Sequence, residues 1–91
     1  MSVTQQEIQW EPTAKAKYDK MIEKIPLFHR QIAKIIVEKK AAINAQARGN
    51  GHILEEDIVR AFLTEVPLAF YSLMIRLMDE VGLDYKKYET N

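Results

Sequence analysis

Arg30 is the side chain best suited to hold an anionic group, because its planar guanidinium can donate two parallel hydrogen bonds to one carboxylate. Glu38 follows eight residues later, so on a helix the two charges lie two turns apart on nearly one face. In the alternative interpretation both are structural. Arg30 could then meet the acidic start of a later helix and Glu38 a lysine of an earlier one, or the two could pair with each other.

The histidines and serines form no catalytic or metal-binding pattern. His29 and His52 lack the spacing of a helical metal motif, and a metal site normally needs three or four convergent ligands. Ser2 and Ser72 lack the glycine-flanked turn of an activated serine. The chain has no cysteine, which excludes disulfides, Cys-ligated clusters and thiol nucleophiles. We therefore predict no catalytic residue, no metal site and no enzyme activity of the chain on its own.

Size and charge narrow the function classes further. The chain has 91 residues, 47% of them hydrophobic, which suits one small domain. Residues 1–50 carry nine basic and five acidic side chains, whereas residues 51–91 carry four and eight, so the net charge is zero. A neutral chain makes nucleic acid an unlikely partner, because surplus Lys and Arg supply most affinity for phosphate backbones. We interpret the opposite charges of the two halves as complementary within the fold.

The apolar spacing predicts an all-α bundle of about four helices. The first covers about 13–24, a long central helix covers about 27–48, a third begins at Glu55, and a fourth follows Pro67 and ends near Val81. Whether the last two are separate or form one rod kinked at Pro67 is open. Around this domain (10–83) we expect a flexible arm over 1–9 and a polar tail over 84–91. No segment reads as a secretory signal or a membrane span, so we expect a cytoplasmic location.

The central helix has two kinds of apolar residue. Small side chains would permit close approach by a neighbouring helix, and they are Ala33, Ala41, Ala42 and Ala45. Larger side chains form a broad stripe that we expect to face the core, namely Phe28, Ile32, Ile35, Ile36 and Ile43, with Ala47.

The fourth predicted helix, in the segment Val66–Val81, is apolar around most of its circumference. One side can serve the core, and the first two helices could sandwich the rest. Otherwise the surplus side is left for another protein, a second copy of the chain or an apolar ligand, with Phe70 and Met74 as candidate contacts.

Several residues match the spacing of a known family pattern. A Trp precedes a short helix, and the run Ile25-Pro26-Leu27-Phe28-His29-Arg30 opens the long one. The remaining matches follow at fixed intervals. They are Glu38, Ala41, Ile53, Glu56 and Ala61, with Trp10 as the initial Trp. Over about Trp10–Thr64 the chain thus resembles the small C-terminal domain of the B subunit of light-independent (dark-operative) protochlorophyllide reductase, the PCP reductase family. His29 and Leu54 depart from the pattern, where the family has an apolar residue and a capping Thr.

The resemblance implies a non-catalytic accessory domain in chlorophyll or bacteriochlorophyll biosynthesis. In the reductase, the catalytic carboxylate and the cluster ligands belong to the large domains, while the C-terminal domain helps to cover the pigment site and to build the assembly. The parent complex is an oxidoreductase of photosynthetic pigment formation. This chain would act by docking to a protein, because without cysteine it cannot hold the cluster.

Two other functions remain open. The chain could carry a tetrapyrrole, with Arg30 holding a propionate and Phe28, His29, Phe70 and Met74 near the ring. A short helix, a long helix and a third one also faintly resemble a histone fold, which would imply a DNA-binding dimer. The zero net charge counts against that interpretation.

Overall fold

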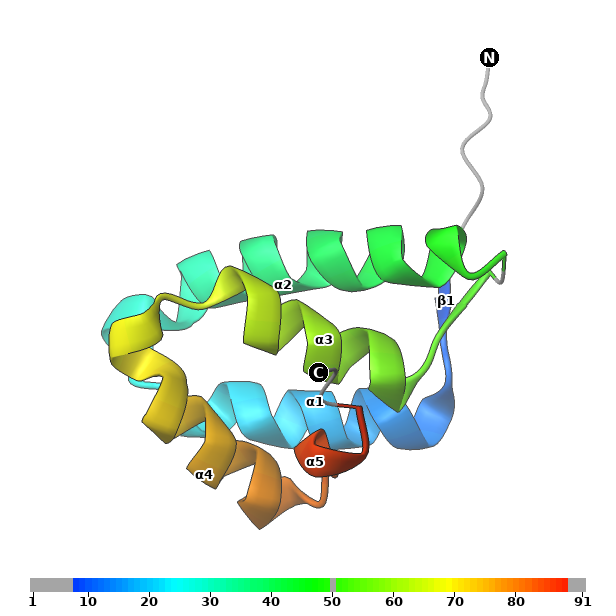
Figure 1. Ribbon diagram of the computed structural model, residues 1–91. Coiled ribbons are helices and arrows are strands. Elements are labelled where there is room, and N and C mark those ends of the chain that lie inside the picture. Colours follow the sequence, from blue (N-terminus) through cyan, green and yellow to red (C-terminus); the bar gives the residue numbers. More distant parts are fainter. Residues whose placement is uncertain (1–7, 50, 89–91) are drawn as a thin grey trace.

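The computed structural model describes residues 8–49 and 51–88 and shows an all-α bundle (Figure 1). Its helices in this part of the chain are α1 (Pro12–Lys24), α2 (Leu27–Ala47), α3 (Glu55–Glu65), α4 (Tyr71–Val81) and α5 (Tyr85–Tyr88), with a 3₁₀ turn η1 (Leu68–Phe70). Two short strands, β1 (Gln9–Trp10) and β2 (His52–Ile53), complete it. The predicted fold class and the long α2 are confirmed, and α3 lies between α2 and α1 in Figure 1.

The two ends of the described chain are more ordered than the sequence predicts. Gln9 and Trp10 pair in parallel with His52 and Ile53, so the fold begins before Trp10. The rest of the expected arm, 1–7, lies outside the described residues. The expected polar tail contains α5, because its aromatic side chains pack on the core at Tyr85 and Tyr88.

Proline determines where the helices begin and separate. Pro12 opens α1, and the Glu11 carboxylate accepts a hydrogen bond of 2.7 Å from the Ala14 N–H. Pro26 separates α1 from α2 as predicted. After Pro67 the fourth helix starts as the 3₁₀ turn η1 and continues as α4 from Tyr71 to Val81, where it ends as predicted. The third and fourth helices are therefore separate.

The buried face of α2 is the small one, which corrects our expectation. Its fully buried side chains are Val37, Ala41 and Ala45, and α2 packs mainly on α3. The isoleucines and Phe28 point outward, and are exposed. The reason is steric: alanines let two helix backbones approach closely, and large core side chains such as Phe62 and Ile58 are supplied by α3 instead.

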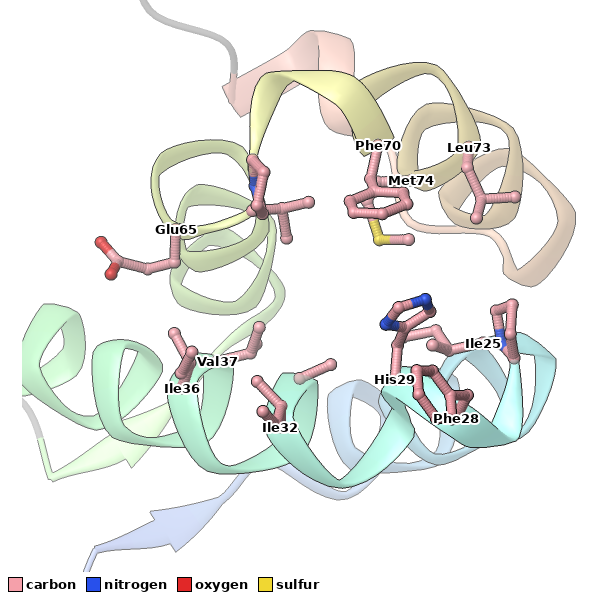
Figure 2. Close-up of a pocket in the computed structure, with 14 residues that line it drawn as sticks. Ile25, Phe28, His29, Ile32, Ile36, Val37, Glu65, Phe70, Leu73 and Met74 are labelled. Carbon is pink, nitrogen blue, oxygen red and sulfur yellow. The ribbon is translucent and has the colours of Figure 1, made fainter.

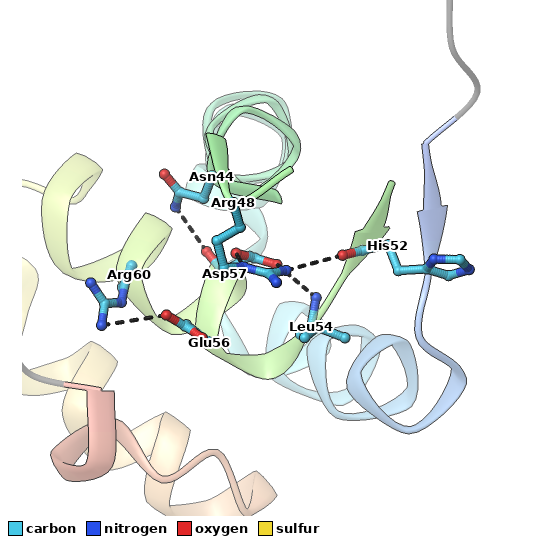
Figure 3. A network of polar contacts seen from close by, with 7 residues as sticks. All are labelled: Asn44, Arg48, His52, Leu54, Glu56, Asp57 and Arg60. Carbon is cyan, nitrogen blue, oxygen red and sulfur yellow. Dashed lines mark hydrogen bonds and ion pairs between the residues drawn. The ribbon is translucent and has the colours of Figure 1, made fainter. Parts of the chain in front are cut away.

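A buried carboxylate joins the end of α2 to the start of α3 (Figure 3). Asp57 is 1% exposed and accepts hydrogen bonds from Nε and Nη2 of Arg48 and, at 2.8 Å, from the Leu54 N–H. These bonds raise the pKa of the Arg48 guanidinium above its usual range. Asn44 donates to the Asp57 carbonyl at 3.1 Å. The Leu54 side chain has no polar atom that could cap α3. The hydrogen bond from the Leu54 N–H to the Asp57 carboxylate is one of the two bonds of a capping box, and it is supplied from within the helix.

Ion pairs connect the basic and acidic halves of the chain. Lys17 of α1 lies 2.7 Å from Glu55 of α3 and also donates to the Gly82 carbonyl, while Lys24 lies 3.3 Å from Glu80. The complementary-charge interpretation is therefore confirmed. Gly82, at φ +85°, ends α4 and lets the Leu83 N–H donate to the Met78 carbonyl.

We expect Asp57→Ala to lower the free energy of unfolding by about 3 kcal/mol, because it removes a cap and the partner of a charged side chain. Glu56→Ala is the matched control. It breaks only an exposed pair with Arg60 and should cost less than about 0.5 kcal/mol. Urea unfolding followed by circular dichroism measures both, and equal losses would contradict the role of Asp57.

Candidate functional site

An apolar groove of about 520 Å³ lies beside the first half of α2 (Figure 2). Residues of α2 form one wall, and the segment from the end of α3 into α4 forms the other. The α2 wall includes Phe28, His29, Ile32 and Ile36, and the facing wall includes Val66, Phe70, Leu73 and Met74.

The groove exists because α4 packs on α1 and not on α2. After α3 ends at Glu65, Pro67 and η1 turn the chain away, as Figure 1 shows. The first half of α2 then projects beyond the helices that cover its second half. A wedge between α2 and α4 stays open, and apolar side chains from both line it.

Beside the groove, α2 carries a row of exposed apolar side chains that a helix brings onto one side. We name it the outer stripe, and it consists of Phe28, Ile32, Ile35, Ile36 and Ile43. Phe28 is 89% exposed, and Ile32 and Ile35 are 63% and 60% exposed. Leu68 of η1 is 85% exposed. A contiguous apolar patch of this size marks a surface that binds something apolar.

The groove offers little polar chemistry. Glu65 is the acidic residue on its rim, and His29 is the other titratable side chain that lines it. The His29 ring lies 5.4 Å from the Phe70 ring and 5.2 Å from the Phe28 ring, measured between centroids. Among the described residues, no group of three or more His, Asp or Glu side chains could hold a metal ion. The site is therefore suited to apolar contact.

Four of the six candidate contact residues come together around this groove. They are Phe28, His29, Phe70 and Met74. The other two, Arg30 and Glu38, do not line it.

Arg30 holds the C-terminal end of α1 and not the acidic start of α3. Its Nη2 donates to the Glu23 carbonyl at 2.9 Å and to the Ile25 carbonyl at 3.0 Å, and its Nε donates to Ile25 at 3.2 Å. Helix carbonyls at this end lack partners within the helix, so a cation satisfies them well. Neither of the structural pairings considered for Arg30, with the start of α3 or with Glu38, is found, and its Nε and Nη2 donors are in use.

Glu38 accepts a hydrogen bond from the Tyr18 hydroxyl at 2.9 Å, in place of the expected lysine. Burial, followed by this carboxylate, raises the pKa of the Tyr18 phenol well above its usual value. Trp10 stacks on the Tyr18 ring at 5.0 Å. Residues shared with the family pattern thus meet one another in the core of the fold.

The remaining pattern residues also have structural positions. Ala41, Ile53 and Ala61 are buried, Pro26 opens α2, and Glu56 pairs with Arg60 at 3.4 Å. None of them lines the groove except Pro26.

Comparison with known proteins found no match among family models, curated proteins or solved structures. The resemblance to the reductase domain therefore stays a prediction.

The sequence analysis expected the outer stripe to face the core, and it located only part of the free apolar surface. The predicted segment Val66–Val81 does supply exposed Leu68 and Phe70 and one wall of the groove. In α4 itself, Met74, Leu77 and Met78 are buried against the core. The exposed surface lies on α2 and η1. The alanines of α2 were a sequence signal for its buried face, because small side chains mark the side on which another helix can pack closely. No helix in the described part of the chain has the length and apolar character needed to cross a membrane.

We expect Arg30→Ala to lower the free energy of unfolding by about 1.5 kcal/mol, because charge-assisted hydrogen bonds to two carbonyls are lost. Lys34→Ala on the exposed surface of the same helix is the control, and should change stability by less than about 0.5 kcal/mol. Thermal and urea unfolding measure both. A stable Arg30→Ala protein would contradict the structural role.

Proposed function

We propose that this chain is a non-catalytic interaction domain that binds protein through its groove and outer stripe. The observation that carries the proposal is that α2 and η1 leave seven large apolar side chains each at least 40% exposed, and that four of them, Phe28, Ile32, Ile36 and Phe70, line one groove. The seven are Phe28, Ile32, Ile35, Ile36, Ile43, Leu68 and Phe70. A monomeric soluble domain rarely leaves such a surface in water without a function for it.

The size of this surface is enough for specific association. At roughly 200 Å² for each fully exposed large apolar side chain, the seven leave roughly 800 Å² accessible. Removing that area from water is worth roughly 20 kcal/mol gross, against an association cost of roughly 4–15 kcal/mol. The surplus of roughly 5–16 kcal/mol corresponds to dissociation constants from roughly 0.2 mM to below about 1 nM, so the area permits association and packing quality sets the affinity.

The family resemblance supplies the proposed setting: a cytoplasmic accessory role with a chlorophyll-type reductase, in assembly or in covering its substrate site. Support comes from the pattern residues, which build the core contacts that hold α1 against α2. The groove adds an apolar surface next to the Pro26–Arg30 run of the same pattern.

The reductase setting predicts direct binding. Purified chain should bind a dark-operative protochlorophyllide reductase with micromolar affinity in biolayer interferometry, and Ile32→Lys should weaken binding at least tenfold. Leu27→Lys is the matched control, since Leu27 is 75% exposed on α2 but does not line the groove. Absence of binding at about 100 μM chain, a free energy weaker than about −5.5 kcal/mol, would overturn this setting.

A tetrapyrrole carrier is the second candidate, and the clustering of Phe28, His29, Phe70 and Met74 favours it. A volume of about 520 Å³ is within the range of small-molecule sites. Arg30 would not hold a propionate in the groove in this arrangement, because it does not line the groove and its Nε and Nη2 donors bind the Glu23 and Ile25 carbonyls.

Absorbance titration with a free-base porphyrin tests this candidate. Binding between the aromatic walls should shift the porphyrin band, and Phe70→Ala should reduce the affinity about tenfold through lost stacking and area. Tyr88→Ala, on α5 and outside the groove, is the control. An unchanged spectrum with folded protein would remove the carrier function.

A further inference from the structure

We propose that the occupant of the groove is a second copy of this chain, in a two-fold symmetric dimer built on the outer stripe. This inference rests on the proposed function, because it names the protein that the same surface binds. Four features of the described residues support it: shape, helix length, charge and area.

The groove and exposed apolar side chains lie together on α2. Phe28, Ile32 and Ile36 line the groove, and Ile35 and Ile43 are exposed on the same helix. A two-fold axis applies one patch to itself, so a patch that joins with itself must contain projections and recesses together. In an antiparallel pair of α2 helices, Ile35, Ile36 and Ile43 of each copy would lie along the α2 wall of the other copy's groove.

The outer stripe also suits antiparallel pairing of two α2 helices. It extends from Phe28 to Ile43, about 23 Å along the helix axis. Its midpoint falls between Ile35 and Ile36, so the two-fold axis would pass there. Phe28 then lies level with Ile43 of the second copy and Ile35 with Ile36, so apolar side chains meet at the centre and at both ends of the contact.

Charge favours this register. Lys39 is the charged residue that falls on the same side of α2 as the outer stripe, and it lies level with Ile32 of the second copy. Ile32 lines the groove, whose rim carries Glu65 as its acidic residue. Each Lys39 can therefore approach Glu65 of the other copy, which gives two symmetric ion pairs. The chain has zero net charge, so no overall repulsion opposes the approach.

The area agrees with what a dimer needs. At roughly 200 Å² for each fully exposed large apolar side chain, the five side chains of the outer stripe offer roughly 600 Å² on each copy, the lower end of what one partner contributes to a specific interface. Lys39 lies between Ile36 and Ile43 within the contact, so its charge needs the pairing with Glu65 of the second copy when it is removed from water.

Sedimentation equilibrium of the full chain, between about 1 and 200 μM, tests the proposal against the monomer mass of 10.6 kDa. We expect twice that mass at the upper concentrations. Ile35→Lys, next to the axis, should weaken dimerisation at least 30-fold while circular dichroism stays unchanged. Leu27→Lys, equally apolar-to-charged and exposed on α2 but off the groove, should dimerise as the original chain does. A monomer at all concentrations, or a dimer unaffected by Ile35→Lys, would overturn the proposal.

A charge exchange tests the register separately. Lys39→Glu and Glu65→Lys should each weaken the dimer about fivefold or more, and the double variant should recover to within about twofold of the original affinity. Losses that simply add would refute the Lys39–Glu65 contact and with it the antiparallel register. The outcome is separable from the reductase experiment: a monomer that binds the reductase refutes only the dimer, and a dimer that does not bind it refutes only the reductase setting.

Discussion

The close contact between the small-residue face of α2 and α3 is the interaction on which the rest of the structure depends. Val37, Ala41 and Ala45 are the fully buried side chains of α2, and Asp57 fixes the contact at one end through Arg48 and the Leu54 N–H. Because that face is buried, helical geometry turns the isoleucines outward. The outer stripe is thus a consequence of how the core packs. Any substitution that enlarged Ala41 would act on the core and, by shifting α3, on the groove wall that follows it.

The opposite end of the bundle is organised by α1, and this explains why the groove stays open. Lys17 and Lys24 connect α1 to the start of α3 and to α4, and Arg30 satisfies the last carbonyls of α1 from the first turns of α2. With α4 held on α1, the outward side of the first half of α2 stays exposed. Lys17, Lys24 and Arg30 of the basic first half are used in these internal contacts. The groove itself is lined mainly by apolar side chains, with Glu65 and His29 as its titratable residues.

Much of this fold could be predicted from residues with strong local effects. Pro12 and Pro26 mark helix starts, Gly82 supplies a left-handed residue at a helix end, and Glu55 to Asp57 open α3. The site was predicted only in part, since Phe28, His29, Phe70 and Met74 were named without their common groove. Sequence periodicity shows that α2 has apolar residues on two faces, but not which face is buried, because both faces satisfy the same pattern. The partners of Arg30 were missed for another reason: backbone carbonyls carry no sequence signal.

The position of Arg30 changes what kind of site this is. A free arginine beside an apolar groove would favour an amphipathic ligand with one anionic end, such as a pigment with a propionate. Here Nη2 of the guanidinium is bound to carbonyls at the end of α1, and the charged groups near the contact surface are Glu65 on the groove rim and Lys39 on the stripe side of α2, of opposite sign. One small ligand could form an ion pair with only one of these two side chains. A protein that lies antiparallel along the outer stripe, with an acidic and a basic side chain placed to match, could pair with both. A second copy of this chain carries both charges in those positions. The arrangement of Lys39 and Glu65 therefore favours a protein occupant of the groove over a pigment.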